Sequence, residues 1–174
     1  NKGHARCHAT GLKYLTEKED FDYVIPMDGD GEDRPEELTL LFNKSKENPS
    51  KLVTLNRIKR SEGFFFKLLY ECHKILTYVF TGELVKFGNY SCVPKEDAAR
   101  LAKEACTWSS FSGSVTKVIP NRTSVPSIRG TRYFGSSKMN LFNLLIHSFS
   151  IIAVFKIVVI ISSILFLFIY LFFV

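Results

Sequence analysis

Acidic residues are missing from the last part of this chain, because none follows Glu104 and all 17 lie within residues 1–104. Those residues also hold 17 of the 23 lysines and arginines, so the whole net charge of +6 belongs to the C-terminal part. The cations there are Lys117, Arg122, Arg129, Arg132, Lys138 and Lys156. A basic segment without acids predicts a surface that faces phosphates or anionic lipid headgroups.

The chain also lacks a CxxC pair, an internal repeat and a low-complexity linker. Its four cysteines are scattered, which favours free thiols in a reducing compartment over a disulfide framework. His4 and His8 are four residues apart with Cys7 between them, a spacing that a metal site could use. No fourth ligand is evident at metal-site spacing, so the sequence does not favour that interpretation.

Charged residues are absent from the 18 residues 157–174, which read IVVIISSILFLFIYLFFV. A helix of that length spans about 27 Å, close to the hydrocarbon core of a bilayer at about 30 Å. The run predicts a transmembrane helix rather than a buried core helix. Because the basic residues precede it, the positive-inside rule places residues 1–156 in the cytoplasm, at an inner or plasma membrane.

Hydrophobic periodicity predicts an α/β domain with a largely parallel sheet. Strands are expected at 21–27, 51–57 and 84–93, and helices at 1–15, 36–46, 63–80, 95–105 and 137–155. Asp33 and Glu36 have the spacing of a capping box, and residues 107–135 are expected to be strand and loop. The expected divisions are a catalytic part (1–106), an acceptor-side and juxtamembrane segment (107–147), and an interfacial and transmembrane part (148–174).

Four carboxylates cluster after the first expected strand, at Asp28, Asp30, Glu32 and Asp33. A calcium EF-hand loop would need glycine at its sixth position and glutamate at its twelfth, and Asp33 and Thr39 stand there. A solvated structural loop remains one alternative. The other is an open Mg²⁺ or Mn²⁺ site, in which carboxylates hold the ion and a substrate's phosphates complete its shell.

Two basic segments could meet such phosphates. NRIKRSEG supplies Arg57 and Arg60 after the second expected strand, and IRGTRYFGSSKMN supplies Arg129, Arg132 and Lys138 together with Ser137. The arginine fork suits phosphate oxygens. A solvated loop or a headgroup-binding patch is the alternative for each segment.

Several stretches resemble family 2 glycosyltransferases of the polyprenyl-phosphate type, the relatives of dolichol-phosphate mannose synthase and bacterial undecaprenyl-phosphate glucosyltransferases. They are NKGHARCHATGLKYL, MDGDGEDRPEEL, NRIKRSEGFFFKLLY, FGNYSCV and RGTRYFGSSKMN, the last followed by a membrane span. The resemblance covers nearly the whole chain. It implies a GT-A (Rossmann-like) fold and inverting, metal-dependent transfer of a hexose from a nucleotide-sugar to a polyprenyl phosphate in cell-envelope glycan synthesis.

The resemblance also implies roles for individual residues. Asp28 and Asp30 would hold Mg²⁺ or Mn²⁺, with Glu32 nearby in a position where relatives often have glutamine. Arg57 and Arg60 would contact phosphates. The acceptor and its phosphate would meet residues from the two later segments: Gly88, Asn89, Ser91, Arg129, Arg132, Ser137 and Lys138.

The family's first strand and its Asp-Asp-x-Ser segment, which bind the nucleotide base, have no counterpart here. We therefore expect a fragment of a longer enzyme that is inactive alone. The expected partners are the nucleotide-sugar, polyprenyl phosphate and membrane lipids, without nucleic acid; a homo-oligomer stays open. Two other functions also stay open, a non-catalytic anchored module that binds anionic lipids and a polysaccharide-elongating enzyme of the same family.

Overall fold

The computed structural model describes residues 3–59, 64–135 and 140–174, so the predicted site residues Arg60, Ser137 and Lys138 lie outside the described residues. The strands are β1 (Tyr23–Val24), β2 (Leu52–Lys59), β3 (Phe87–Pro94) and β4 (Arg122–Ile128). The α-helices are α1 (His4–Lys18), α2 (Leu38–Glu47), α3 (Phe64–Thr81), α4 (Lys95–Lys103), α5 (Phe111–Val118), α6 (Leu141–Val154) and α7 (Lys156–Phe173). Two short 3₁₀ turns are η1 (Pro35–Glu37) and η2 (Ala105–Trp108).

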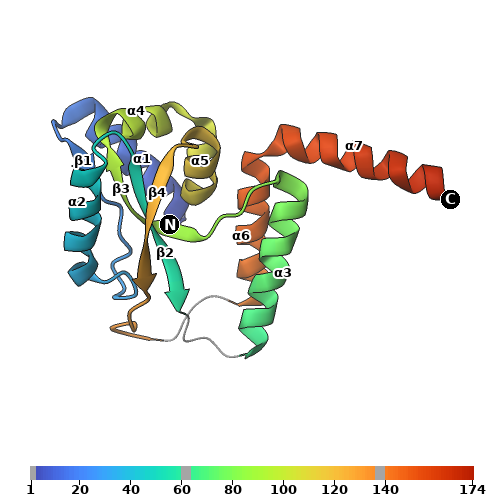
Figure 1. The fold of residues 1–174 in the computed structure, drawn as a ribbon, viewed down its shortest axis with the longest axis horizontal. Coiled ribbons are helices and arrows are strands. Elements are labelled where there is room, and N and C mark those ends of the chain that lie inside the picture. Colours follow the sequence, from blue (N-terminus) through green and yellow to red (C-terminus); the bar gives the residue numbers. More distant parts are fainter. Residues whose placement is uncertain (1–2, 60–63, 136–139) are drawn as a thin grey trace.

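The strands form one sheet in the order β1-β3-β2-β4, with helices on both faces (Figure 1). Successive strand residues point to opposite faces, so Leu52 joins a core with helices α1, α4, α5 and α6, whereas Val53 joins a core with α2. Phe111 of α5 is buried in the first core and Leu41 of α2 in the second. This confirms the α/β class that the sequence predicts.

The sheet is mixed, so the expectation of a largely parallel sheet is wrong. β2 and β4 are parallel, but β3 runs antiparallel to both β1 and β2. The reason lies in α3, which packs on α6 and α7 instead of crossing over the sheet. Without a crossover the chain re-enters the sheet in the opposite direction, as β3.

A helix occupies part of the segment 107–135 that the sequence predicts to be strand and loop. Helix α5 has the composition FSGSVTKV, which is poor in good helix formers. It forms because Phe111 and Val115, one turn apart, are both buried in the core, and because the Ser110 side chain accepts a hydrogen bond from the Gly113 amide. Tertiary packing outweighs weak propensity here.

The first predicted strand and the predicted capping box also differ from the structure. β1 is only two residues long. Arg34, not Asp33, precedes the turn η1, and no side chain caps it. The Asp33 carboxylate instead accepts a hydrogen bond from the Asp28 amide, inside the loop of residues 28–33, called the acidic loop below.

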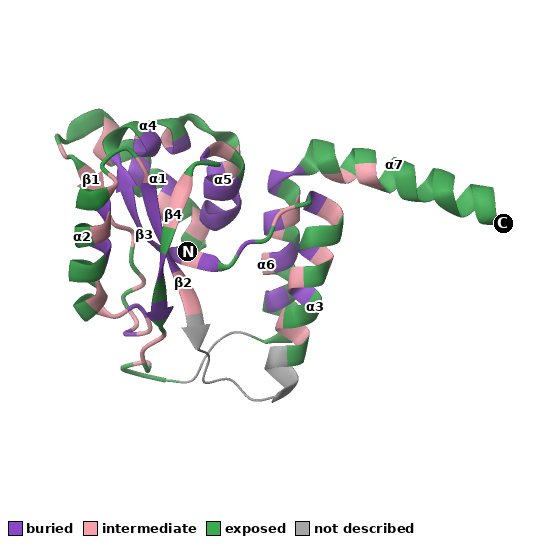
Figure 2. Ribbon diagram, in the orientation of Figure 1, coloured by how far each residue is buried: buried purple, intermediate pink, exposed green. Residues whose placement is uncertain are grey.

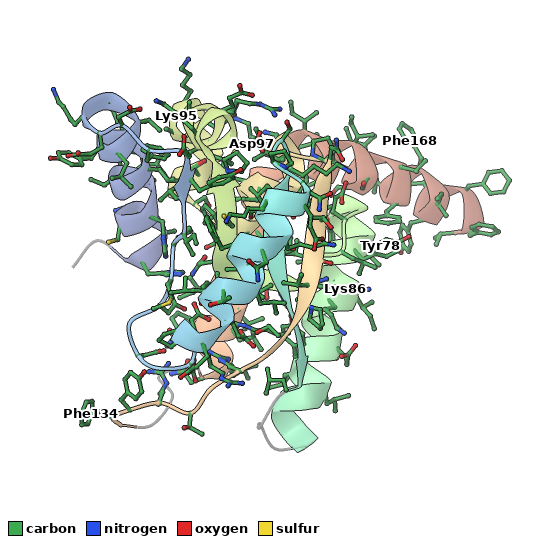
Figure 3. The ribbon with its side chains drawn as sticks, turned by 60° about the vertical axis from the view of Figure 1, so that its left-hand side comes forward. Tyr78, Lys86, Lys95, Asp97, Phe134 and Phe168 are labelled. Atoms are coloured by element: carbon green, nitrogen blue, oxygen red, sulfur yellow. The ribbon has the colours of Figure 1, made fainter. Side chains whose placement is uncertain are left out.

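Helices α3, α6 and α7 form an apolar extension beside the sheet (Figure 2). α6 buries Leu144, Ile151 and Val154 but leaves Phe142 and Phe149 exposed. α7 has a mean hydropathy of 2.6 and none of its residues is buried, so it is long and apolar enough to span a membrane. Phe168 on α7 and Phe134 in the loop after β4 lie at opposite ends of the molecule (Figure 3).

Candidate functional site

A pocket of about 350 Å³ opens between the sheet and the helices α3 and α6. Its walls come from segments that are far apart in the sequence: the start of α1, the acidic loop, β2, β3 and the two residues before it, α5, the segment after β4, and α3 and α6. The pocket collects eight of the residues singled out from the sequence. They are Asp28, Asp30, Glu32, Arg57, Gly88, Asn89, Arg129 and Arg132.

The acidic loop is held in shape by its own side chains. Asp30 Oδ1 accepts a hydrogen bond from the Glu32 amide at 3.0 Å, and Asp33 Oδ2 accepts one from the Asp28 amide at 2.9 Å. Gly31 lies between them with φ 92°, a conformation that side chains disfavour. Asp28 and Asp30 both line the pocket.

The segment after β4 docks directly onto this loop. The amides of Gly130 and Tyr133 donate to the carbonyl oxygens of Glu32 and Asp30, at 2.8 and 2.9 Å. The approach is so close that a Cβ on Gly130 would lie 2.4 Å from the Gly31 carbonyl oxygen. Glycine is therefore required at 130, and the two loops form one unit.

Two arginines of the docked segment neutralise the loop. Arg132 contacts Asp30 Oδ2 at 2.9 Å and Glu32 Oε1 at 3.3 Å, and Arg129 pairs with the other oxygen of Glu32. These side chains are all largely shielded from solvent. A desolvated guanidinium needs an anionic partner, and here the partners are the carboxylates for which the sequence suggests a metal.

Arg57 of β2 pairs in the same way with Asp33, the last carboxylate of the loop. Its guanidinium lies 3.3 Å from Asp33, whose side chain is 4% exposed. Burial raises the pKa of Asp33, and the charge of Arg57 opposes that shift. Arg57 reaches this position across Gly88 of β3, where a Cβ would meet the guanidinium at 2.9 Å. A side chain at position 88 would therefore displace the end of Arg57.

Asp28 has a different set of neighbours. Asn89 Nδ2 donates to Asp28 Oδ1 at 3.4 Å and to His4 Nε2 at 2.6 Å. His8 lies one helical turn further along α1, and its ring and that of His4 have centroids 5.1 Å apart. Burial and the neighbouring His4 lower the pKa of His8, whereas Asp28 raises it. Histidines therefore surround the one carboxylate of the loop for which the described residues give no ion pair.

Among the predicted site residues that the structure describes, Ser91 is the one that the pocket does not contain. It is fully buried in β3, and its hydroxyl donates to the Asn89 carbonyl oxygen at 3.0 Å. Ser91 therefore contacts the backbone of Asn89 inside the protein rather than the pocket.

Sequence reasoning missed two histidines in the pocket wall, His73 of α3 and His147 of α6. His73 Nδ1 lies 2.6 Å from Ser148 Oγ, and burial together with the charge of His73 lowers the pKa of His147 to about 4. Each is the single histidine of a largely apolar helix, a pattern that carries no metal or catalytic signature. Their pairing follows from the packing of α3 on α6.

Asp28 and Asp30 supply the oxygen ligands that Mg²⁺ or Mn²⁺ prefers, and both face the pocket. Asp30 would exchange its contact with Arg132 for such an ion. Both oxygens of Glu32 are engaged by arginines. No protein-family model, curated protein or solved structure gives a significant match to this chain, so its function is inferred from these residues.

Proposed function

We propose that the chain is part of a membrane-bound, metal-dependent glycosyltransferase that moves a sugar from a nucleotide-sugar to a polyprenyl phosphate. The supporting observation is the pocket, where eight residues named from the family resemblance converge from four separate segments beside an apolar helical extension. Carboxylates and arginines at one pocket suit a reaction whose donor and acceptor both carry phosphates.

The chemistry of a phosphate acceptor explains why the pocket needs cationic side chains rather than a general base. A phosphate monoester has a second pKa of about 6, so it is largely dianionic at neutral pH and attacks without a general base. The protein has to bind and orient it. Arg57, Arg129 and Arg132 line the pocket and offer guanidinium groups for that purpose.

Asp28 and Asp30 would hold the divalent ion, which when bound neutralises charge on the departing nucleoside diphosphate. Glu32 has a different role in this proposal. Because its carboxylate contacts both Arg129 and Arg132, it positions these two side chains at the pocket. An incoming phosphate would replace the carboxylates as the partner of one or both arginines.

The apolar extension fits an acceptor that is itself a lipid. α7 would cross the bilayer, α6 with its exposed Phe142 and Phe149 would lie at the interface, and the pocket would face the cytoplasm. The polar end of a polyprenyl phosphate would then reach the pocket without leaving the membrane.

A non-catalytic, anionic-lipid-binding module is the second candidate, and one observation favours it. The ion pairs of Arg129 and Arg132 account for Asp30 and Glu32 without a metal. They do not account for Asp28, which contacts Asn89. Divalent-ion binding that depends on Asp28 and Asp30 separates the two candidates.

The test is Asp30→Asn in the full-length protein that contains this chain, assayed by transfer of radiolabelled sugar into organic-extractable lipid with Mn²⁺. Loss of one ligand and its charge at the reaction centre is expected to lower the rate by at least about a hundredfold. The matched control is Asp20→Asn, because Asp20 is exposed and pairs only at the surface with Lys95. Normal transfer by Asp30→Asn would contradict the proposal.

A further inference from the structure

Helix α1 presents two imidazoles on one face, and one of them, that of His4, lines the pocket. His4 and His8 are one turn apart, with ring centroids 5.1 Å apart in an edge-to-face arrangement. Residues at this spacing lie one above the other on a helix. A pair of histidines four apart on a helix is the arrangement with which zinc-binding helices hold their ion.

The acidic loop adds a carboxylate to this pair. One ligand atom from each of His4, His8 and Asp28 can be chosen so that all lie within 4.8 Å of one another. Around a tetrahedral ion with bonds of about 2.0–2.1 Å, ligand atoms lie roughly 3.3 Å apart. His4 is exposed and the other two are half-buried, and their ligand atoms would have to move closer together to close around an ion.

Asn89 marks the point where these lone pairs converge. Its Nδ2 is a pure donor, and it lies 2.6 Å from His4 Nε2 and 3.4 Å from Asp28 Oδ1. Both of those atoms therefore direct a lone pair at one position. A cation that replaced the amide there would meet a nitrogen and an oxygen ligand at once.

We propose that His4, His8 and Asp28 form a binding site for Zn²⁺ or a similar first-row transition ion. Imidazole nitrogens select such ions over Mg²⁺ and Ca²⁺. The set is distinct from Asp28 and Asp30 as a magnesium or manganese pair, but it shares Asp28 with that pair. An ion held by the histidines therefore competes for Asp28 with the ion of that pair, and this second part of the inference depends on the proposed function.

Binding is tested on the full-length, chelator-treated protein in detergent, with Zn²⁺ measured against a chromophoric chelator and Co²⁺ observed by its visible absorption. We expect one ion per chain and an affinity at least about tenfold weaker in His8→Gln, since even outer-shell partners of a metal affect affinity 10- to 100-fold. The matched control is Cys7→Ser, an exposed thiol on the same helix. It should bind normally, and cobalt should show no thiolate charge-transfer band.

Three results would overturn the site: no stoichiometric Zn²⁺ binding, full affinity in His8→Gln, or lost affinity in Cys7→Ser. His8 packs near Phe111, with ring centroids 5.8 Å apart, so its replacement could disturb α1. The exposed His4→Gln variant avoids this, and its circular dichroism should match that of wild type. Retained affinity in a folded His4→Gln protein would equally overturn the site.

The shared carboxylate is tested without an activity assay, by the electron paramagnetic resonance of Mn²⁺. One equivalent of Zn²⁺ should release bound Mn²⁺ from the wild-type protein but not from His8→Gln. Zn²⁺ binding with undisturbed Mn²⁺ would refute only the shared use of Asp28. A protein that never binds Mn²⁺ would count against the proposed function and leave the zinc site standing.

Discussion

The acidic loop and helix α7 differ in where their partners lie. In the loop, three carboxylates are matched by arginines of the same chain: Asp30 and Glu32 by Arg129 and Arg132, and Asp33 by Arg57. In α7 no residue is buried, although its mean hydropathy is 2.6. The charges of the loop are paired within the protein, whereas the apolar side chains of α7 need partners outside it.

The difference shows what each region can do. An ion pair formed within the chain is exchanged only for a ligand that offers an equal or better partner, which makes the loop selective. Exposed apolar surface needs only an apolar medium, so α7 suits an unspecific partner such as a bilayer. Specific recognition is therefore expected at the pocket and membrane attachment at the helix.

The largest effect is expected from charges placed on α7. Leu165→Arg with Phe168→Arg should cost about 5–7 kcal/mol of insertion free energy, at about 2.5–3.5 kcal/mol for each central arginine. The protein should then be extracted from membranes by alkaline carbonate. Tyr14→Arg, which changes an exposed aromatic residue on α1, should remain in the membrane fraction. A double variant that resists carbonate would remove the contrast between the two regions.

A smaller effect is expected at His147, where the pocket meets the apolar helices. Burial, followed by the charges of His73, His4 and Arg57, lowers the pKa of His147 to about 4, below its ordinary value of 6.5. Protonation therefore favours the unfolded chain. The contribution of His147 to the free energy of unfolding is fully present above pH 6.5 and falls as the pH drops toward 4. At 1.36 kcal/mol per pKa unit, the loss between pH 7 and pH 5 is about 2 kcal/mol.

The measurement is urea unfolding in a mild detergent at both pH values, for the wild type and His147→Gln. The loss of unfolding free energy between pH 7 and pH 5 is compared for the two proteins. The difference between the two losses is the contribution of His147. Identical loss of stability in both proteins would show that His147 is protonated as readily in the folded state as in the unfolded chain.

A tenfold to hundredfold effect on rate is expected from Arg132→Ala. Each charge-assisted contact to a phosphate contributes about 1.5–3 kcal/mol, and 1.36 kcal/mol corresponds to one decade in rate. The apparent KM for polyprenyl phosphate should rise, or kcat fall, while hydrolysis of the donor by water changes little. Arg100→Ala, an exposed arginine paired with Asp97, is the control. Wild-type kinetics toward the lipid in Arg132→Ala would place the acceptor site elsewhere.

Local patterns in the sequence predict much of the fold. Helices α1, α2, α3 and α4 and strand β2 have clear periodicity, and each lies where it is expected. Helix α5 is the exception, because its residues favour a helix only when Phe111 and Val115 have a core to enter. The antiparallel direction of β3 likewise could not be predicted from the sequence, because it depends on α3 packing against α6 rather than on the sheet.

Residue types predict which side chains gather at the pocket but not which of them pair. The acidic loop and the segment after β4 both carry charges that suit phosphates and metals. Their direct ion pairs depend on the close approach at Gly130, which is set by the three-dimensional course of two loops about a hundred residues apart. The approach of Asp28 to His4 and His8 depends in the same way on where α1 lies beside the loop.

The segment after β4, which carries Arg129 and Arg132, docks onto the acidic loop. The pocket therefore holds nearly equal numbers of positive and negative side chains. Three carboxylates and four cationic side chains line it among the described residues. A divalent ion alone adds positive charge and has to displace Arg132 from Asp30. The acceptor's phosphate alone has to displace the carboxylates from the arginines. When both arrive, the freed guanidinium groups meet phosphate and the freed carboxylates meet metal, so the two ligands favour each other's binding, and by linkage the effect is mutual.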